Sequence, residues 1–350
     1  MYYIICILLV GLNSYFAERK DKKSYLIFCA VILSLFCGFR GIGTGVDTEN
    51  YYNFMSYVRS RGISFGSDIG FSAISYFLMG IFKNPYYPLL VYAIVTNFLI
   101  VLRLWDFREE ASLCLMLLIY VTMQYPYTFN IVRQYLAISI IFWGTRYIET
   151  GKYFKYILLN IVAAMIHTSA ILCFSILFVT VGNNTKNNKT KILGYGLSIV
   201  FVFAGVFLLN DNVVKYSKYF VTSDATVYGM VILKFLCLVL VLVSNKMFTN
   251  REFSVSTNGE LRSMRRQISI LYSVGLLLSA LGMWFTFMNR IGFYFMSFEM
   301  PFWGQTVRAK VNNKIYKVII GVIIIYVLLS TYIAGESADN LFYYQSFLKN

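Results

Sequence analysis

The side chains with the clearest chemical potential stand at the start of one apolar stretch. Arg133 and Gln134 follow an aromatic stretch at 124–127 and open a long apolar run. An arginine at such a position costs roughly 2.5–3.5 kcal/mol in hydrocarbon, so it either faces the protein interior or reaches out to the interface. Because the planar guanidinium donates two parallel hydrogen bonds, it suits phosphate oxygens. We therefore predict that Arg133 and Gln134 bind a phosphate-bearing substrate.

The single histidine of the chain, His167, lies inside another apolar run. An ionisable residue in such surroundings is by default a candidate for function, and imidazole is the usual general base near neutral pH. His167 is therefore a candidate catalytic base, with Asp47 or Glu49 as substitutes. A neutral histidine that forms a hydrogen bond between two helices would show the same sequence pattern.

Two further arginines are candidate phosphate ligands. Arg40 begins a glycine-rich segment with Gly41, Gly43 and Gly45, whose glycines let the backbone turn tightly and approach a ligand. A helix-capping turn with a local ion pair between Arg40 and an aspartate explains the same residues. Arg290 lies between two late apolar runs and is a second candidate cation for phosphate. An ordinary arginine in a short loop is the alternative.

The composition indicates a membrane protein. Of 350 residues, 58% are hydrophobic and only 13% are charged, with a mean hydropathy of +0.64, values that a soluble domain does not reach. The net charge of +15 comes from lysines and arginines in short gaps between apolar runs, which excludes a nucleic-acid-binding face. Phosphate-loop, nucleophile-elbow and multi-histidine motifs are missing, so we predict neither a cofactor nor a metal.

The apolar runs predict the fold class. Most are close to the ~20 residues that cross the hydrocarbon core as a helix, and lipid forbids unpaired backbone. We predict an all-α, polytopic transmembrane bundle with about 10–12 membrane segments, forming a single domain over 1–350. The runs fall at 2–17, 24–39, 70–82, 87–104, 111–124, 134–149, 156–181, 191–210, 228–246, 268–287, 290–307 and 317–335.

The basic gaps predict the orientation, because cytoplasmic loops are enriched in lysine and arginine. The gap at 18–23 is basic and is placed in the cytoplasm, so the loop at 40–69 is external. If 70–82 and 156–181 each cross once, five basic residues of 103–155 move outside, so the positive-inside count favours the other arrangement. In it, 70–82 lies along the outer interface or dips into the membrane. The run 156–181 then turns back near His167 as a re-entrant or broken hairpin, since it is too short for two full crossings.

In these motifs the chain resembles the EpsG-like branch of the Wzy-type polysaccharide polymerases. The shared features are the glycine segment followed by tyrosines at 40–52, the Asn-x-x-Arg-Gln helix start at 130–134, the His-x-Ser of 167–169, and the late arginine with aromatics at 290–295. They follow the same order through nearly the whole chain. The glycine segment departs from the usual form, since Gly45 and Val46 separate Thr44 from Asp47.

The resemblance implies a metal-independent glycosyltransferase of the bacterial plasma (inner) membrane. It implies transfer of an O-antigen or capsule repeat unit from undecaprenyl pyrophosphate to a lipid-linked acceptor at the extracytoplasmic face, without a nucleotide sugar. His167 and Asp47 would be catalytic, while Arg40, Arg133, Gln134 and Arg290 would bind pyrophosphate. Implied partners are membrane lipid, a chain-length regulator and a flippase. A flippase for lipid-linked oligosaccharides, or a ligase that uses the same donor, is the alternative function.

Overall fold

A computed structural model describes residues 2–66, 68–185, 187–208, 259–282, 286–308 and 341–349, with a few single residues between these ranges. In this part of the chain the secondary structure is helical, apart from one isolated β-bridge between Arg40 and Ser346. The predicted all-α class is therefore confirmed for the described residues. The predicted runs 228–246 and 317–335 lie for the most part outside them.

From α1 to α10 the helices follow one another with short connections. The N-terminal half contains α1 (Tyr2–Lys20), α2 (Lys23–Gly38), α3 (Thr48–Arg61), α4 (Ile69–Ile81), α5 (Tyr86–Asp106), α6 (Leu113–Ile119), η1 (Tyr120–Gln124), η2 (Tyr125–Phe129) and α7 (Val132–Glu149). After α7 come α8 (Tyr153–Ile166), η3 (Thr168–Cys173), α9 (Phe174–Asn184), α10 (Asn188–Leu208), α13 (Gly259–Leu281), α14 (Thr286–Met296), α15 (Glu299–Arg308) and η5 (Phe347–Lys349).

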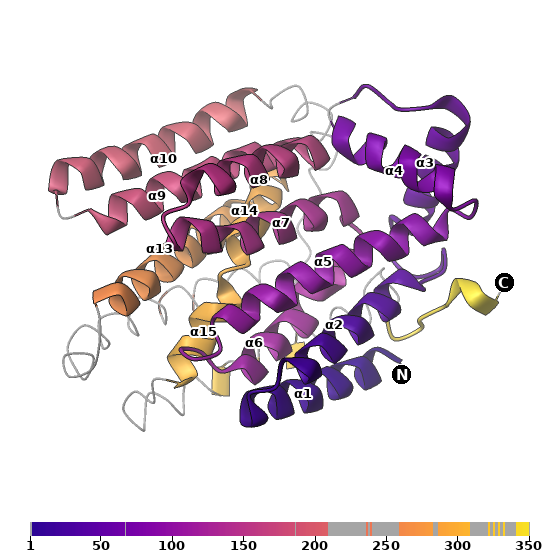
Figure 1. The fold of residues 1–350 in the computed structure, drawn as a ribbon, viewed down its shortest axis with the longest axis horizontal. Coiled ribbons are helices and arrows are strands. Elements are labelled where there is room, and N and C mark those ends of the chain that lie inside the picture. The colour runs from indigo at the N-terminus through magenta and orange to yellow at the C-terminus, as the bar shows by residue number, and fades with distance from the viewer. Residues whose placement is uncertain are drawn as a thin grey trace.

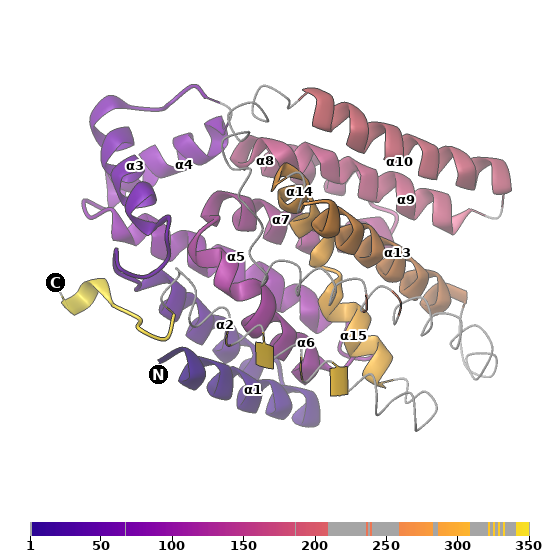
Figure 2. The same ribbon diagram turned by 180° about the vertical axis from the view of Figure 1, so that it is seen from behind.

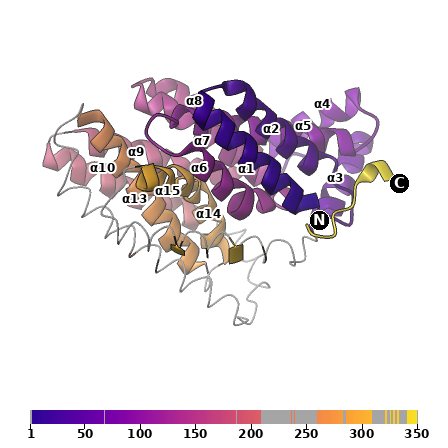
Figure 3. The same cartoon turned by 90° about the horizontal axis from the view of Figure 1, so that it is seen from below.

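The long helices form a row. Helices α1, α2, α5, α7 and α8 lie side by side in that order, each packed on the next, and α9 with α10 continues the row at its far edge (Figure 1). Seen from behind, α13, α14 and α15 lie in front of this row, and α6 packs against α1 and α15 (Figure 2). Seen from below, α13 to α15 lie on one side of the row (Figure 3). Helices α3 and α4 pack together at one end of the row, meaning the side on which its helices end at the right of Figure 1.

Only some of these helices have the dimensions of a membrane span. Among the described residues, α5 is the helix whose length and apolar composition are sufficient to cross a membrane. Several shorter apolar segments accompany it, namely Lys23–Gly38, Ile69–Ile81, Leu113–Phe129, Tyr153–Ile166 and Thr168–Gly182. The number of crossings, the interfacial helix at 70–82 and the re-entrant segment at 156–181 therefore stay predictions.

The predicted continuous run at 290–307 is wrong in one respect, because it is divided between α14 and α15. The break follows from Pro301, which lacks the backbone N–H that would bond to the carbonyl of Ser297 in an unbroken helix. Proline is tolerated in the first turn of α15, where such N–H groups have no partner in the helix. The predicted external loop at 40–69 likewise contains a helix, α3.

A buried arginine joins α5 to α7 at the end of the row remote from α3 and α4. Arg103 is 1% exposed, and its guanidinium contacts the carboxylates of Asp106, at 3.2 Å, and Glu149. Its Nε donates to Thr145 at 3.2 Å, and the group lies 4.2 Å from the ring centre of Phe107. Because removing one partner leaves the others partly buried and unpaired, this network holds the two helices in register.

We predict that Arg103→Met lowers the free energy of unfolding by about 3 kcal/mol, the lower end of the range for a broken buried ion pair, since both carboxylates keep some exposure. Denaturant unfolding of the purified protein in detergent measures the change. The matched control is Arg108→Ala, which removes a surface pair with Asp21 and should cost less than about 1 kcal/mol. Equal losses in both variants would contradict the assigned role of Arg103.

The C-terminal segment at 341–349 lies against the start of the loop that follows α2. The backbone N–H of Gly41 donates to the carbonyl of Gln345 at 2.7 Å. The ring of Phe347 stacks on Tyr86 with centroids 4.4 Å apart and planes only 6° from parallel. In Figure 1 this yellow segment lies beside the end of α2 and near α3. Residues 341–349 and the glycine segment are therefore on the same side of the protein.

We predict that single cysteines at Ser60 and Leu348, both exposed, react alike with an impermeant thiol reagent in intact spheroplasts, in a variant without native cysteines. A cysteine at the exposed Lys22 should stay unreacted until the membrane is opened, because its basic gap is predicted to be cytoplasmic. Protection of Ser60 until lysis would overturn the orientation, and opposite behaviour of Ser60 and Leu348 would contradict the packing of the C-terminal segment.

Candidate functional site

Polar groups from two other parts of the chain converge on the carboxylate of Asp68. Its Oδ1 accepts hydrogen bonds from the backbone N–H and the hydroxyl of Thr168, at 3.0 and 3.1 Å. Its Oδ2 lies 2.9 Å from Nη1 of Arg133 and 3.4 Å from Nδ1 of His167. The Asp68 side chain is 9% exposed, so these groups replace the water that a free carboxylate would bind.

A break in the helical hairpin presents His167 and Thr168. Helix α8 ends at Ile166, and His167 is extended, with φ −147° and ψ 111°. The chain then folds back, and the hydroxyl of Tyr156 donates to the carbonyl of Cys173 at 2.7 Å to tie the two arms together. At the break, the backbone N–H of Thr168 donates a hydrogen bond to the carboxylate of Asp68. The turn of this otherwise apolar hairpin is thus polar.

Close packing of α4 on α8 brings Asp68 to this break. A Cβ atom at Gly70 would lie 2.8 Å from the carbonyl oxygen of Met165, so only glycine allows the two backbones this approach. Asp68 occupies the N-cap position of α4 but its side chain does not bond to the helix N-terminus. Its carboxylate is instead directed to the neighbouring hairpin, which is an unusual use of an N-cap aspartate.

Arg133 completes the cluster from the first turn of α7. Its guanidinium lies 5.9 Å from the ring centre of Tyr51 and 5.8 Å from that of Phe71, on α3 and α4. Its side chain is 41% exposed, against 21% for His167. Arg133 is therefore held by a carboxylate and two aromatic faces while part of its surface stays accessible to a ligand.

The charges of the cluster stabilise one another. Burial raises the pKa of Asp68, but the hydrogen bond and charge of His167, the charge of Arg133 and the N–H of Thr168 outweigh it, and the net pKa lies below its usual value. Burial also raises the pKa of Tyr51, against the opposing influence of Arg133. Asp68 is thus an anion near neutral pH, next to a permanent cation and a titratable imidazole.

Gln134 and Arg290 connect the cluster to the late helices. Gln134 is 2% exposed, and its side-chain amide donates to the backbone carbonyl of Arg290, which joins α7 to α14. The hydroxyls of Ser169 and Tyr294 lie 3.2 Å apart and join η3 to α14. Gln134 therefore makes an internal bond between helices, and its predicted role in binding pyrophosphate, like that of Arg290, stays a prediction.

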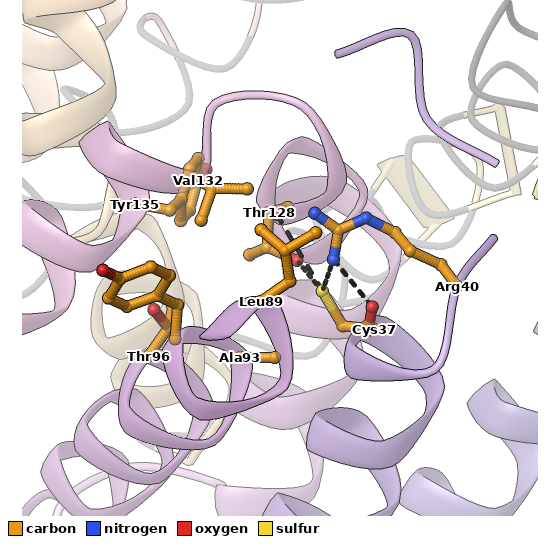
Figure 4. A pocket seen from close by; sticks show the side chains of 9 residues that line it. Cys37, Arg40, Leu89, Ala93, Thr96, Thr128, Val132 and Tyr135 are labelled. Atoms are coloured by element: carbon orange, nitrogen blue, oxygen red, sulfur yellow. Dashed lines mark hydrogen bonds between the residues drawn. The ribbon is translucent and has the colours of Figure 1, made fainter. Parts of the chain in front are cut away.

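Arg40 lies in a different set of contacts. It is 1% exposed, and its Nη1 donates to the carbonyl of Cys37 at 2.7 Å while its Nε donates to the hydroxyl of Thr48 at 3.0 Å. Its Nη2 has no hydrogen-bond partner among the described residues. The guanidinium borders a cavity with room for about one water molecule, lined also by Thr128 and Tyr135 (Figure 4). In the structure Arg40 anchors the end of α2 to α3.

Asp47 lies at the N-terminus of α3, outside the contacts of Asp68. The side-chain amide of Asn50 donates to its carboxylate at 3.0 Å, and its backbone N–H lies 3.5 Å from the amide oxygen of Asn130. Gly45 provides the turn before it, with a φ of +82° that favours glycine. Glu49 is exposed. The catalytic role predicted for Asp47 therefore stays untested by these contacts.

Of the six predicted site residues, the structure brings Arg133 and His167 together through Asp68, which the sequence interpretation did not select. Asp68 follows Gly66 and precedes an apolar run, the ordinary pattern of a helix cap, and this pattern concealed it. Among the described residues no group of three or more histidine, cysteine, aspartate or glutamate side chains is placed to hold a metal ion.

The comparisons with known proteins agree with the predicted resemblance. The model of the EpsG family matches residues 23–346, nearly the whole chain. No curated protein and no solved structure matches the chain. The matched range includes Asp68, Arg133 and His167. The chain belongs to the EpsG family, a family of membrane-associated, Wzy-like polymerases of polysaccharide biosynthesis.

Proposed function

We propose that this protein is a polysaccharide polymerase that transfers a glycan from undecaprenyl pyrophosphate to a lipid-linked acceptor repeat unit. Membership of the EpsG family supports a polymerase-like glycosyltransferase. The single observation that carries the proposal is the cluster in which a partly accessible Arg133 and His167 meet at one carboxylate. An anion-binding cation next to a proton acceptor is what a transfer from a diphosphate leaving group needs.

In the proposed reaction the acceptor hydroxyl oxygen forms a bond to the anomeric carbon of the donor glycan. The bond between that carbon and the pyrophosphate oxygen breaks, and the electron pair leaves with the lipid pyrophosphate. Arg133 stabilises the negative charge that develops there, because its guanidinium can donate parallel hydrogen bonds to two phosphate oxygens. His167 accepts the proton of the acceptor hydroxyl. Held together in one site, the two lipid-linked substrates react as if in one molecule.

The location of the cluster supports an extracytoplasmic site. Asp68 lies in the segment 40–69, which the basic gaps predict to be external, and Arg133 opens α7 at the same end of the row as α3 and α4. Arg103 and the basic gap at 18–23 belong to the opposite end. We propose that the protein works in the bacterial plasma membrane with its active face outside, supplied by a flippase and acting with a chain-length regulator.

We predict that deleting the gene abolishes all glycan bands longer than one repeat unit, and that Arg133→Lys fails to restore them. Lysine keeps the positive charge but loses the two parallel donors, so polymerisation should fall by at least about 10²-fold. The measurement is the glycan ladder of the deletion strain after complementation, at matched protein levels. A full ladder with Arg133→Lys would refute the assigned role, and loss of every glycan-capped band on deletion would indicate a flippase or ligase instead.

We predict that His167→Gln lowers the polymerisation rate as strongly as His167→Ala, by about 10²–10⁴-fold, because glutamine can form hydrogen bonds but cannot take the proton. Repeat-unit polymerisation in isolated membranes measures the rate, and retention of a labelled lipid donor should change little. If His167→Gln polymerises like the unaltered protein, His167 is a structural residue and not the base.

A further inference from the structure

We infer that Asp68 is a positioning residue, which orients His167 with Nδ1–H toward the carboxylate and thereby leaves Nε2 as the proton acceptor. The inference rests on the proposed function for its consequence in catalysis, but the orientation itself is a property of the protein alone. Asp68 is identified by its contacts and not by family membership or by the sequence motifs.

The two carboxylate oxygens of Asp68 have different partners. Oδ1 is occupied by two donors from Thr168, at 3.0 and 3.1 Å, which fixes the plane and rotation of the carboxylate. Oδ2 then faces His167 at 3.4 Å and Arg133 at 2.9 Å. Because three of these four contacts involve the short segment at 167–168, the aspartate and the break in the hairpin form one rigid unit.

A further observation concerns the imidazole. An ionised carboxylate only accepts hydrogen bonds, so the ring nitrogen that faces it must carry the hydrogen. In a neutral imidazole the other nitrogen, Nε2, then has the free lone pair. The Nδ1 to Oδ2 distance of 3.4 Å is long, as is common before a substrate tightens the site. The contact with Asp68 therefore selects the tautomer that can act as a base through Nε2.

An asparagine at position 68 would reverse this selection. Its side-chain oxygen could keep the two bonds from Thr168, but its amide nitrogen would then face His167 as a donor. Nδ1 would have to accept, and the hydrogen would move to Nε2, where it blocks proton uptake. The substitution also removes the anion beside Arg133. Asp68→Asn thus keeps the size of the side chain, changes the tautomer, and leaves Arg133 without its acceptor at position 68.

A purely structural role for Asp68, as a link between α4 and the hairpin, is distinguishable from this inference. A structural link acts on the whole site, so its loss would multiply with the loss of His167. A residue that acts through His167 has nothing left to orient once the imidazole is gone. The two roles therefore differ in a double-mutant cycle and in the state of the imidazole itself.

The first experiment uses the fact that His167 is the only histidine of the chain. Full-length protein with ¹⁵N-labelled histidine and a purification tag free of histidine gives signals from this one imidazole, and their shifts report which nitrogen carries the hydrogen at a pH where the ring is neutral. We expect Nδ1–H in the unaltered protein and Nε2–H in Asp68→Asn. Nε2–H in the unaltered protein, or no change on substitution, would overturn the inference, whatever reaction the protein catalyses.

The second experiment measures polymerisation in membranes for Asp68→Asn, His167→Gln and the double variant. We expect each single variant to lose about 10²-fold or more, and the double variant to be no slower than the slower single variant. Multiplying losses would overturn the role through His167 and would indicate that Asp68 acts through its ion pair with Arg133. A normal rate for Asp68→Asn would overturn the role as well. Asp106→Asn is the matched control, since it removes another arginine-bound carboxylate at the opposite end and should polymerise within about threefold of the unaltered protein.

The two experiments separate this inference from the proposed function. If the unaltered protein shows the Nδ1–H tautomer but its gene does not govern chain length, the orienting role of Asp68 holds and the polymerase assignment fails. If polymerisation is confirmed and the tautomer does not depend on Asp68, the assignment holds and the inference fails. Thermal unfolding of each purified variant shows whether a lost rate reflects a lost fold.

Discussion

The site depends on one buried carboxylate that is turned away from its own helix. An aspartate at the start of a helix ordinarily bonds to the helix N–H groups, and Asp68 does not. It instead accepts bonds from Thr168, His167 and Arg133, which come from a broken hairpin and from α7. The close contact of Gly70 with Met165 makes this reach possible, because any side chain there would push α4 away from α8. One interaction thus couples three helices to the candidate chemistry.

The helical class followed from composition, because a chain this apolar has few other ways to satisfy its backbone. Individual helix ends were less predictable. The break before α15 depends on Pro301, and the reversal at His167 depends on bonds such as that from Tyr156 to Cys173, which join residues 17 apart. Apolar periodicity reports that a segment is buried, but it does not report where the backbone leaves the helix to meet a distant partner.

The residues of the candidate site were likewise predictable only in part. Arg133 and His167 were predictable because a charged or titratable residue in an apolar run needs a reason. Asp68 was not, because its position matches an ordinary helix cap, and only the packing of α4 on α8 shows where its carboxylate goes. For Arg40 the sequence argument cannot distinguish a ligand-binding arginine from one whose guanidinium donates hydrogen bonds to Cys37 and Thr48, so its role in binding pyrophosphate stays a prediction.

The contacts around Arg103 and Arg133 also differ in charge, and the difference fits their roles. Arg103 is 1% exposed and contacts two carboxylates, so its charge is already compensated and it serves as a link between helices. Arg133 and His167 share the carboxylate of Asp68, and Arg133 stays partly accessible. With a neutral imidazole this second cluster has no net charge, and it gains one positive charge when His167 takes up a proton. In the proposed transfer that gain coincides with the negative charge that develops on the departing pyrophosphate, so the site becomes more complementary to the ligand as the reaction proceeds.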